Sequence, residues 1–310
     1  MVETSYAFLL SLTIIVAGYV LKRIGFWGPE DGKTLTRVIL NLTLPALILR
    51  TIIGIELNAS YALLPVICVV WSAFIIGVAL LVFRHRPPAE RAVVAIGSVG
   101  YNIGLFAYPL VNAVWGLAGL QYLAMFDIGS AFTNFGISFT LAAVLSARAQ
   151  DKESTLRARE VLVLPLKSVP LMTYFVALAL NLIGFQLPRF LDDLLAVFAE
   201  ANQVLVLLLL GLFLSFVFDR SQVRDILNVF LIRYTLGLAA GIALFFALPF
   251  DFLYRAVVLV AMILPVSMTV VAFSVKFGFD EKLAGALVNL SIVVSFVIMW
   301  VLVALLQGVQ

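Results

Sequence analysis

Long apolar stretches follow one another along the whole chain, with only short polar breaks between them. A stretch of about 20 apolar residues can cross the hydrocarbon core of a bilayer as a helix. Such stretches occupy residues 5–22, 34–55, 61–83, 91–112, 119–146, 165–184, 203–219, 225–248, 254–275 and 282–306. The pattern predicts an all-α integral membrane protein with ten transmembrane helices and no separate soluble domain.

Composition and charge agree with this interpretation. The chain is 64% hydrophobic and 12% charged, whereas soluble domains average about 45–50% apolar and 25% charged residues. With the N-terminus outside, 17 of the 20 lysines and arginines fall in inside connections, and only Arg50, Arg189 and Arg255 fall outside. Basic residues prefer cytoplasmic connections. We therefore expect a bacterial-type plasma (inner) membrane location with both termini on the outer side.

The rest of the chemistry is sparse. The basic residues form no patch with interleaved aromatics, so no nucleic-acid partner is expected. Cys68 and His85 are the only cysteine and histidine of the chain. This rules against Cys/His metal clusters and most nucleophile arrangements. We expect no cofactor, no metal site and no enzymatic activity.

The chain divides into two halves of five predicted helices. Residues 1–146 form the first half, a basic cytoplasmic connection spans 147–164, and residues 165–310 form the second half. Because five is an odd number, a repeat in the second half would be inverted in the membrane. Inverted repeats are typical of many secondary transporters.

The fourth predicted helix contains residues that disfavour a continuous helix. Gly100, Asn102, Gly104 and Pro109 lie close together in it, and glycine and proline both weaken helices. Asn102 comes 11 residues after Arg91, which is about 16 Å along a helix and about half of the hydrocarbon core. We expect this helix to break at the membrane midplane.

The ninth predicted helix contains a proline at a matching depth. Pro265 comes 10 residues after Arg255, about 15 Å along a helix. Ser267, Met268 and Thr269 follow it, and hydroxyls after a proline can cap a new half-helix. A matched pair of interrupted helices indicates a transporter binding site. Simple kinks in both helices remain the alternative interpretation.

The two breaks predict an anion site that needs no lysine or arginine. Each second half-helix would begin at the midplane with free N–H groups and a partial positive charge. Two such ends could bind a carboxylate, with Asn102 donating its amide group and the hydroxyls capping or contacting the ligand. Arg50 and Arg233 lie near span ends, so both are expected to extend to lipid headgroups. The predicted substrate-binding residues are Gly100, Asn102, Gly104, Pro265, Ser267, Met268 and Thr269.

Two further polar residues lie in the fifth predicted helix. Asp127 is a carboxylate at membrane depth, which is costly and often functional. It could bind a proton or cation beside the crossing, or it could simply be bonded to Ser130 or Thr133. Asn134 lies one heptad later and shares its face, so it could line a polar cavity or join two helices.

Three sequence features together resemble one known family. They are the string LNLTLPAL from Leu40 to Leu47, the spacing of Asn102 and Pro109, and Ile263-Leu264-Pro265 followed by Ala272-Phe273-Ser274. Over nearly its whole length the chain resembles the auxin efflux carrier (PIN-like) family. Its bacterial members include proposed malonate and malate permeases.

The resemblance implies an architecture. The fourth and ninth helices would cross as broken helices in a mobile transport domain, and helices 1, 2, 6 and 7 would form a scaffold, often in a homodimer. Tyr101, Asn102, Pro109 and Pro265 match crossover and helix-break positions. Asn41 and Pro45 belong to the scaffold motif. Tyr101 stands where plant members carry a proline, which favours a bacterial-type carboxylate carrier over an auxin carrier.

These features together predict a secondary transporter for a small organic anion. A mono- or dicarboxylate would cross by alternating access, in an elevator-like motion. The expected partners are this anion, the lipid bilayer and a second copy bound through the scaffold helices. A passive anion channel and a membrane-embedded enzyme remain alternatives. The channel would need a polar stripe on several helices, and the enzyme would need an acidic pair, cysteine or histidine at membrane depth.

Overall fold

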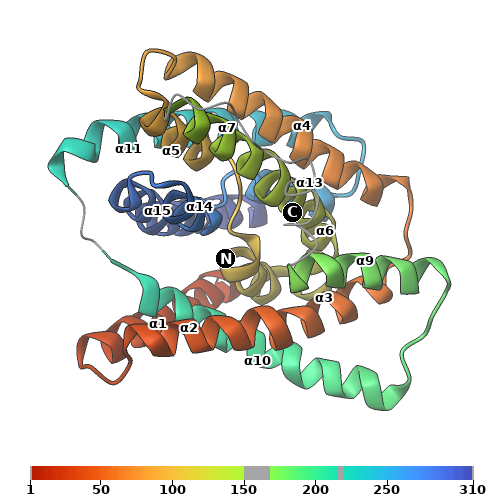
Figure 1. Cartoon of the computed structure of the whole chain (residues 1–310). Coiled ribbons are helices and arrows are strands. Elements are labelled where there is room, and N and C mark those ends of the chain that lie inside the picture. Colours follow the sequence, from red (N-terminus) through yellow and green to blue (C-terminus); the bar gives the residue numbers. More distant parts are fainter. Residues whose placement is uncertain (1, 150–167, 216–218, 309–310) are drawn as a thin grey trace.

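The computed structural model describes residues 2–149, 168–215 and 219–308, and in these ranges the regular structure is helical apart from one isolated β-bridge (Figure 1). Within them, 7 helical stretches are long and apolar enough to cross a membrane, and Val169–Leu182 and Phe252–Ala261 are shorter apolar helices. The predicted all-helical membrane protein is thereby confirmed. The ten-helix inverted repeat stays a prediction, since broken helices are too short to count as spans by length alone.

One group of helices, the first helix group, lies along the lower part of Figure 1. In it α1 packs on α10, and α3 packs on both α9 and α10. The helices α1 and α10 approach closely at glycines: a Cβ atom on Gly211 would lie 2.0 Å from the Ile15 carbonyl oxygen. The members are α1 (Val2–Arg23), α2 (Pro29–Val38), α3 (Leu44–Ile53), α9 (Val169–Leu182) and α10 (Arg189–Phe213).

The start of α10 corrects one sequence-based prediction. The predicted span begins at residue 203, but the helix begins at Arg189 directly after Pro188. A proline whose φ and ψ are non-helical suits the position before a helix, because it lacks the N–H that the helix interior needs. The acidic residues of this segment therefore lie on the first turns of a membrane helix.

The remaining helices among the described residues form the second helix group. Here α4 packs on α6, α5 on α7, α12 on α13, and α14 on α15. The members are α4 (Ala59–Val82), α5 (Pro88–Ser98), α6 (Tyr108–Phe132), α7 (Phe139–Ala149), α11 (Val223–Phe230), α12 (Gly237–Ala247), α13 (Phe252–Ala261), α14 (Thr269–Phe277) and α15 (Glu281–Gln307).

The stretch Ile103–Ala149 is 47 residues long, about 70 Å as a straight helix and more than twice the hydrocarbon core. Tyr101 lies just before this stretch and Phe126 near its middle, yet their ring centroids are 5.7 Å apart. The stretch therefore cannot be straight. The backbone leaves the helical region at Gly116, with φ 59° and ψ −151°. Positive φ is readily adopted only by glycine. The stretch therefore consists of two helical parts that meet at Gly116.

Two π-helical turns precede prolines. The turn Ile39–Thr43 comes before Pro45, and Ile103–Ala107 comes before Pro109. Proline cannot donate to the carbonyl four residues earlier. In both places the residue just before the proline donates five residues back, so Tyr108 N bonds Ile103 O. Pro45 and Pro109 are thus accommodated in the first turns of α3 and α6 by a local widening of the helix.

The predicted cytoplasmic connection at 147–164 lies largely outside the described residues, which stop at 149 and resume at 168. The division of the chain into 1–146 and 165–310 therefore stays a prediction.

Candidate functional site

Two interrupted helices cross at one point. Helix α5 ends at Ser98 and α6 begins after the π turn 103–107, while α13 ends at Ala261 and α14 begins at Thr269. Between these ends, Tyr101 and Val266 form an antiparallel β-bridge. The backbone N–H of Asn102 donates to the Pro265 carbonyl over 3.0 Å. The two non-helical segments thus satisfy part of each other's backbone inside the fold, as irregular backbone in a membrane requires.

Gly100 occupies a position where a side chain does not fit. Its φ is +79°, and a Cβ atom there would lie 2.3 Å from Asn134 Oδ1 and 3.4 Å from Ser267 Cβ. Three of the predicted site residues, from three separate segments, therefore converge at the crossing. The sequence predicted that Gly100 would allow close backbone approach, and the backbone does pass against these two side chains.

Two asparagine side chains at the crossing are buried with unused polar atoms. Asn102 is 5% exposed, and within the described part of the chain its Nδ2 has no hydrogen-bond partner. Asn134 donates to Tyr101 O over 3.4 Å and to Ser130 Oγ over 3.3 Å, but its Oδ1 has no partner among the same residues. An unpaired buried polar group costs about 1–3 kcal/mol. Two of them beside a helix break make the crossing the candidate position for a polar ligand.

The segment after Pro265 is held from two sides. Ser267 Oγ accepts hydrogen bonds from Thr269 N over 3.3 Å and from Thr269 Oγ1 over 2.9 Å, at the start of α14. On the other side, Ser291 Oγ of α15 accepts from Val266 N over 2.9 Å. The side chain of Met268 is partly buried against the core. The loop therefore has a fixed shape rather than being a simple kink.

Other predicted residues lie at the edge of this site. A Cβ atom on Gly104 would lie 3.1 Å from Leu44 Cδ2, so Gly104 faces the first helix group. Pro109 is buried in the first turn of α6. Asn41 is exposed and donates to the Arg37 carbonyl over 2.8 Å, away from the crossing. Pro45 lies in the first turn of α3.

The interpretation of Arg233 as a headgroup contact is wrong. Arg233 is 3% exposed and donates to backbone carbonyl oxygens of the crossing, including Gly100 O over 2.7 Å and Leu264 O over 2.6 Å. Its guanidinium carbon also lies 4.9 Å from the ring centre of Tyr101. A basic residue is therefore part of the crossing, contrary to the expectation that none would be near. Its place 8 residues into the predicted span 225–248, about 12 Å deep, was the available sequence signal.

Asp127 has partners other than those considered from the sequence. Tyr174 on α9 donates a hydrogen bond to its Oδ2 over 2.5 Å, and Tyr108 and Tyr174 are hydrogen-bonded to each other through their hydroxyls. Ser130 instead accepts from Asn134, and Thr133 Oγ1 has no partner in the described part of the chain. Nothing in the sequence distinguished these two tyrosines from other aromatic residues of apolar spans.

Two polar contacts, one made by Arg50 and one by the buried Asn202, were not predicted from the sequence. Arg50 Nε lies 3.3 Å from Asp192 Oδ1, so it joins α3 to α10. Asn202 on α10 is 1% exposed and accepts a hydrogen bond from Thr43 Oγ1 over 2.8 Å. Both contacts link helices of the first group, and polar side chains often join membrane helices in this way.

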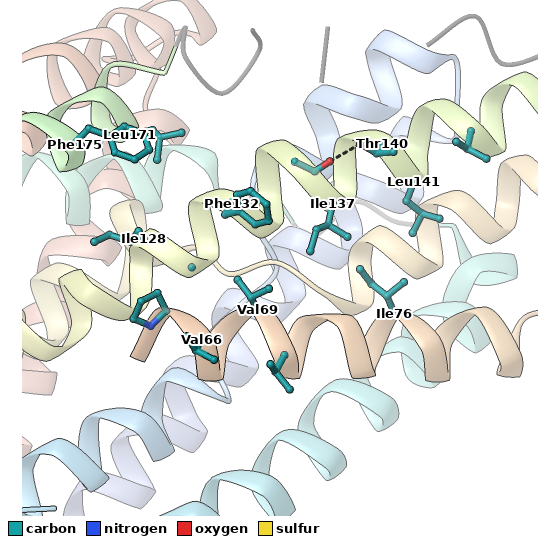
Figure 2. A pocket seen from close by; sticks show the side chains of 15 residues that line it. Val66, Val69, Ile76, Ile128, Phe132, Ile137, Thr140, Leu141, Leu171 and Phe175 are labelled. Carbon is teal, nitrogen blue, oxygen red and sulfur yellow. Dashed lines mark hydrogen bonds between the residues drawn. The ribbon is translucent and has the colours of Figure 1, made fainter. Parts of the chain in front are cut away.

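A large apolar cavity lies elsewhere, between α4, α6, α7 and α9 (Figure 2). Its volume is about 980 Å³, and Phe132, Ile137 and Leu171 are among the residues lining it. The Thr140 hydroxyl in its wall is already bonded to the Gly136 carbonyl over 2.8 Å. A surface of this kind suits apolar chains. It offers no donors for an anion, so the crossing remains the candidate site.

An all-helical membrane protein whose two broken helices meet inside the fold belongs, by architecture, with membrane transporters. The family model described as "Membrane transport protein" matches residues 5–303. The chain therefore belongs to this family, the auxin efflux carrier or PIN-like family, as its sequence resemblance indicated. It is 26% identical over 293 residues to an "Uncharacterized transporter" of Methanothermobacter thermautotrophicus, covering 92% of this chain and 93% of that protein. Membership of a transporter family argues against an enzyme.

Proposed function

We propose that the protein is a secondary transporter that carries a small organic anion, a carboxylate, bound at the crossing of the two broken helices. The observation that carries this proposal is the buried amide of Asn102, whose Nδ2 has no partner in the described residues. Helix α6, with its leading π turn, and α14 begin on either side of it, and helix N-termini attract anions. A carboxylate oxygen would supply the missing acceptor.

An elevator-like motion is the mechanism we propose. The first helix group packs mainly within itself, and so does the second group, which carries the whole crossing. Movement of the second group against the first would carry a bound anion across without dismantling either core. The predicted inverted repeat and a homodimer through the first group fit this arrangement and remain part of the proposal.

Asp127 is the candidate coupling residue within this proposal. It lies on the second group, half-buried, and accepts a hydrogen bond from Tyr174 on the first group. A carboxylate at this depth is costly unless it is paired or exchanges a proton or cation. Binding of a proton or cation at Asp127 would change its bond to Tyr174 and hence the contact between the two groups.

The test compares two asparagines. Asn102→Ala removes the unpaired buried amide, whereas Asn41→Ala removes an exposed amide bonded only to its own helix. If the Asn102 amide binds substrate, its loss should weaken binding by about 1–3 kcal/mol, or roughly fivefold to more than a hundredfold in the dissociation constant. The measurement is saturable exchange and binding of labelled malonate, with a carboxylate panel, in proteoliposomes.

Each outcome bears on the proposal. Tenfold weaker binding in Asn102→Ala with unchanged thermal stability, and wild-type binding in Asn41→Ala, would support it. Equal binding in folded Asn102→Ala would place the substrate elsewhere. Flux that rises linearly without saturation would favour the passive channel. Release of a chemically changed product would favour the membrane enzyme.

A further inference from the structure

The Arg233 side chain is an isolated positive charge in the interior. It projects from the π turn Leu231–Leu236 that joins α11 to α12 and is 3% exposed. Among the described residues no aspartate or glutamate is ion-paired with it. A charge inside a membrane protein is costly and usually pairs with another charge or with backbone carbonyls. Here it pairs with carbonyls.

The carbonyls that Arg233 contacts all belong to the two broken helices. Nη1 donates to Ser98 O over 3.2 Å and Nη2 to Gly100 O over 2.7 Å, at the end of α5. Nε and Nη2 donate to Leu264 O over 2.9 and 2.6 Å, and Nη2 also reaches Pro265 O at 3.0 Å, just beyond the end of α13. One guanidinium thus bonds carbonyls at or just beyond the C-terminal ends of both first half-helices.

The charges at the crossing can be compared. Each helix C-terminus carries roughly −0.5 of an elementary charge and each N-terminus roughly +0.5. The guanidinium, which lies beside both negative ends, therefore roughly cancels their charge. The positive ends of the two second half-helices are left unopposed, with a combined charge of about +1.

We propose that Arg233 sets the charge of the binding site and makes it selective for a monoanion, such as a monocarboxylate. This inference rests on the proposed binding of substrate at the crossing. Arg233 acts as a positioning and selectivity residue, because its donors are taken up by the backbone. A dianion would leave about one negative charge uncompensated in the interior, and a neutral molecule would leave the positive ends unused.

Three compounds of nearly the same size test the charge preference. Malonate is a dianion at neutral pH, malonamate is a monoanion and malonamide is neutral. Competition against exchange of labelled malonate in proteoliposomes gives an apparent affinity for each. The wild type should bind malonamate at least tenfold more tightly than malonamide, and more tightly than malonate.

Two variants separate selectivity from folding. Arg233→Gln removes the charge but keeps donors, and Arg233→Lys keeps the charge while losing the forked geometry. Both will lower stability, because carbonyls lose partners. The malonamate-to-malonamide affinity ratio should fall at least tenfold in Arg233→Gln and be largely retained in Arg233→Lys. If the hydrogen bonds of Arg233 only stabilise the fold, both variants should lose stability and keep the wild-type affinity ratio.

The outcomes are distinguishable. A folded Arg233→Gln protein with the wild-type ratio would overturn the role of Arg233 while leaving carboxylate transport intact. If Arg233→Gln does not fold, tighter wild-type binding of malonate than of malonamate still overturns the inference. If the wild type bound none of the three compounds, the proposed carboxylate site would be contradicted, and the inference would fail with it.

Discussion

Tyr174 on α9 donates a hydrogen bond to Asp127 on α6 over 2.5 Å, and this bond links the first helix group to the second. The Tyr174 hydroxyl is also bonded to that of Tyr108, at the start of α6. Both tyrosine side chains are fully buried. The carboxylate therefore lies at the junction across which an elevator motion would occur.

If Asp127 is the coupling site, Asp127→Asn should abolish accumulation of labelled malonate driven by a proton or sodium gradient. Downhill exchange should survive, because the crossing is untouched. Tyr174→Phe serves as the comparison: it keeps the carboxylate and removes a bond to it, which should cost about 1–3 kcal/mol of stability. Unchanged accumulation in Asp127→Asn would leave Asp127 with a structural role only.

Gly100→Ala should destabilise the crossing and stop exchange. The residue has φ +79°, and the added Cβ would lie 2.3 Å from Asn134 Oδ1. The left-handed backbone alone costs about 1–2 kcal/mol for a residue other than glycine. Gly285→Ala on α15 is the matched control, since a Cβ atom there meets nothing within 4 Å. Thermal unfolding and malonate exchange are the measurements. Malonate exchange at the wild-type rate in Gly100→Ala would show that the crossing can accommodate a Cβ atom without loss of transport.

Gly211→Ala should separate α1 from α10. The added Cβ would lie 2.0 Å from the Ile15 carbonyl oxygen, and backbone cannot give way as a flexible side chain can. Overpacking of this kind typically costs about 1–3 kcal/mol. Gly77→Ala on α4, where a Cβ atom has no neighbour within 4 Å, should be near neutral. Melting temperatures of the two purified variants in the same detergent test this. Equal values would contradict the close packing of the two helices.

The predicted topology can be tested with single cysteines in a Cys68→Ala background. Gln186→Cys, in the exposed connection between α9 and α10, should react with a membrane-impermeant maleimide on intact cells. His85→Cys, in the exposed connection between α4 and α5, should react only after permeabilisation. Tags on both termini should be accessible from outside, and Ser154→Cys, which lies outside the described residues, should be protected. Labelling of Gln186→Cys and His85→Cys from the same face would contradict the charge-based orientation.

The sequence by itself determined that this is a helical membrane protein, and it indicated the family. These properties depend on local features: the length of apolar stretches, and prolines that remove backbone donors. For the same reason it predicted breaks near Asn102 and Pro265, where helices do end in the structure.

Only the tertiary structure decided which residues meet at the breaks. Arg233 bonds to Gly100 although 133 positions separate them, and Asp127 finds Tyr174 rather than a hydroxyl on its own helix. Hydropathy gives the depth of a residue along its helix but not the neighbour that its side chain faces. That choice depends on how the helices pack. The long side chain of Arg233 turns inward because packing brings carbonyls of both broken helices within its reach.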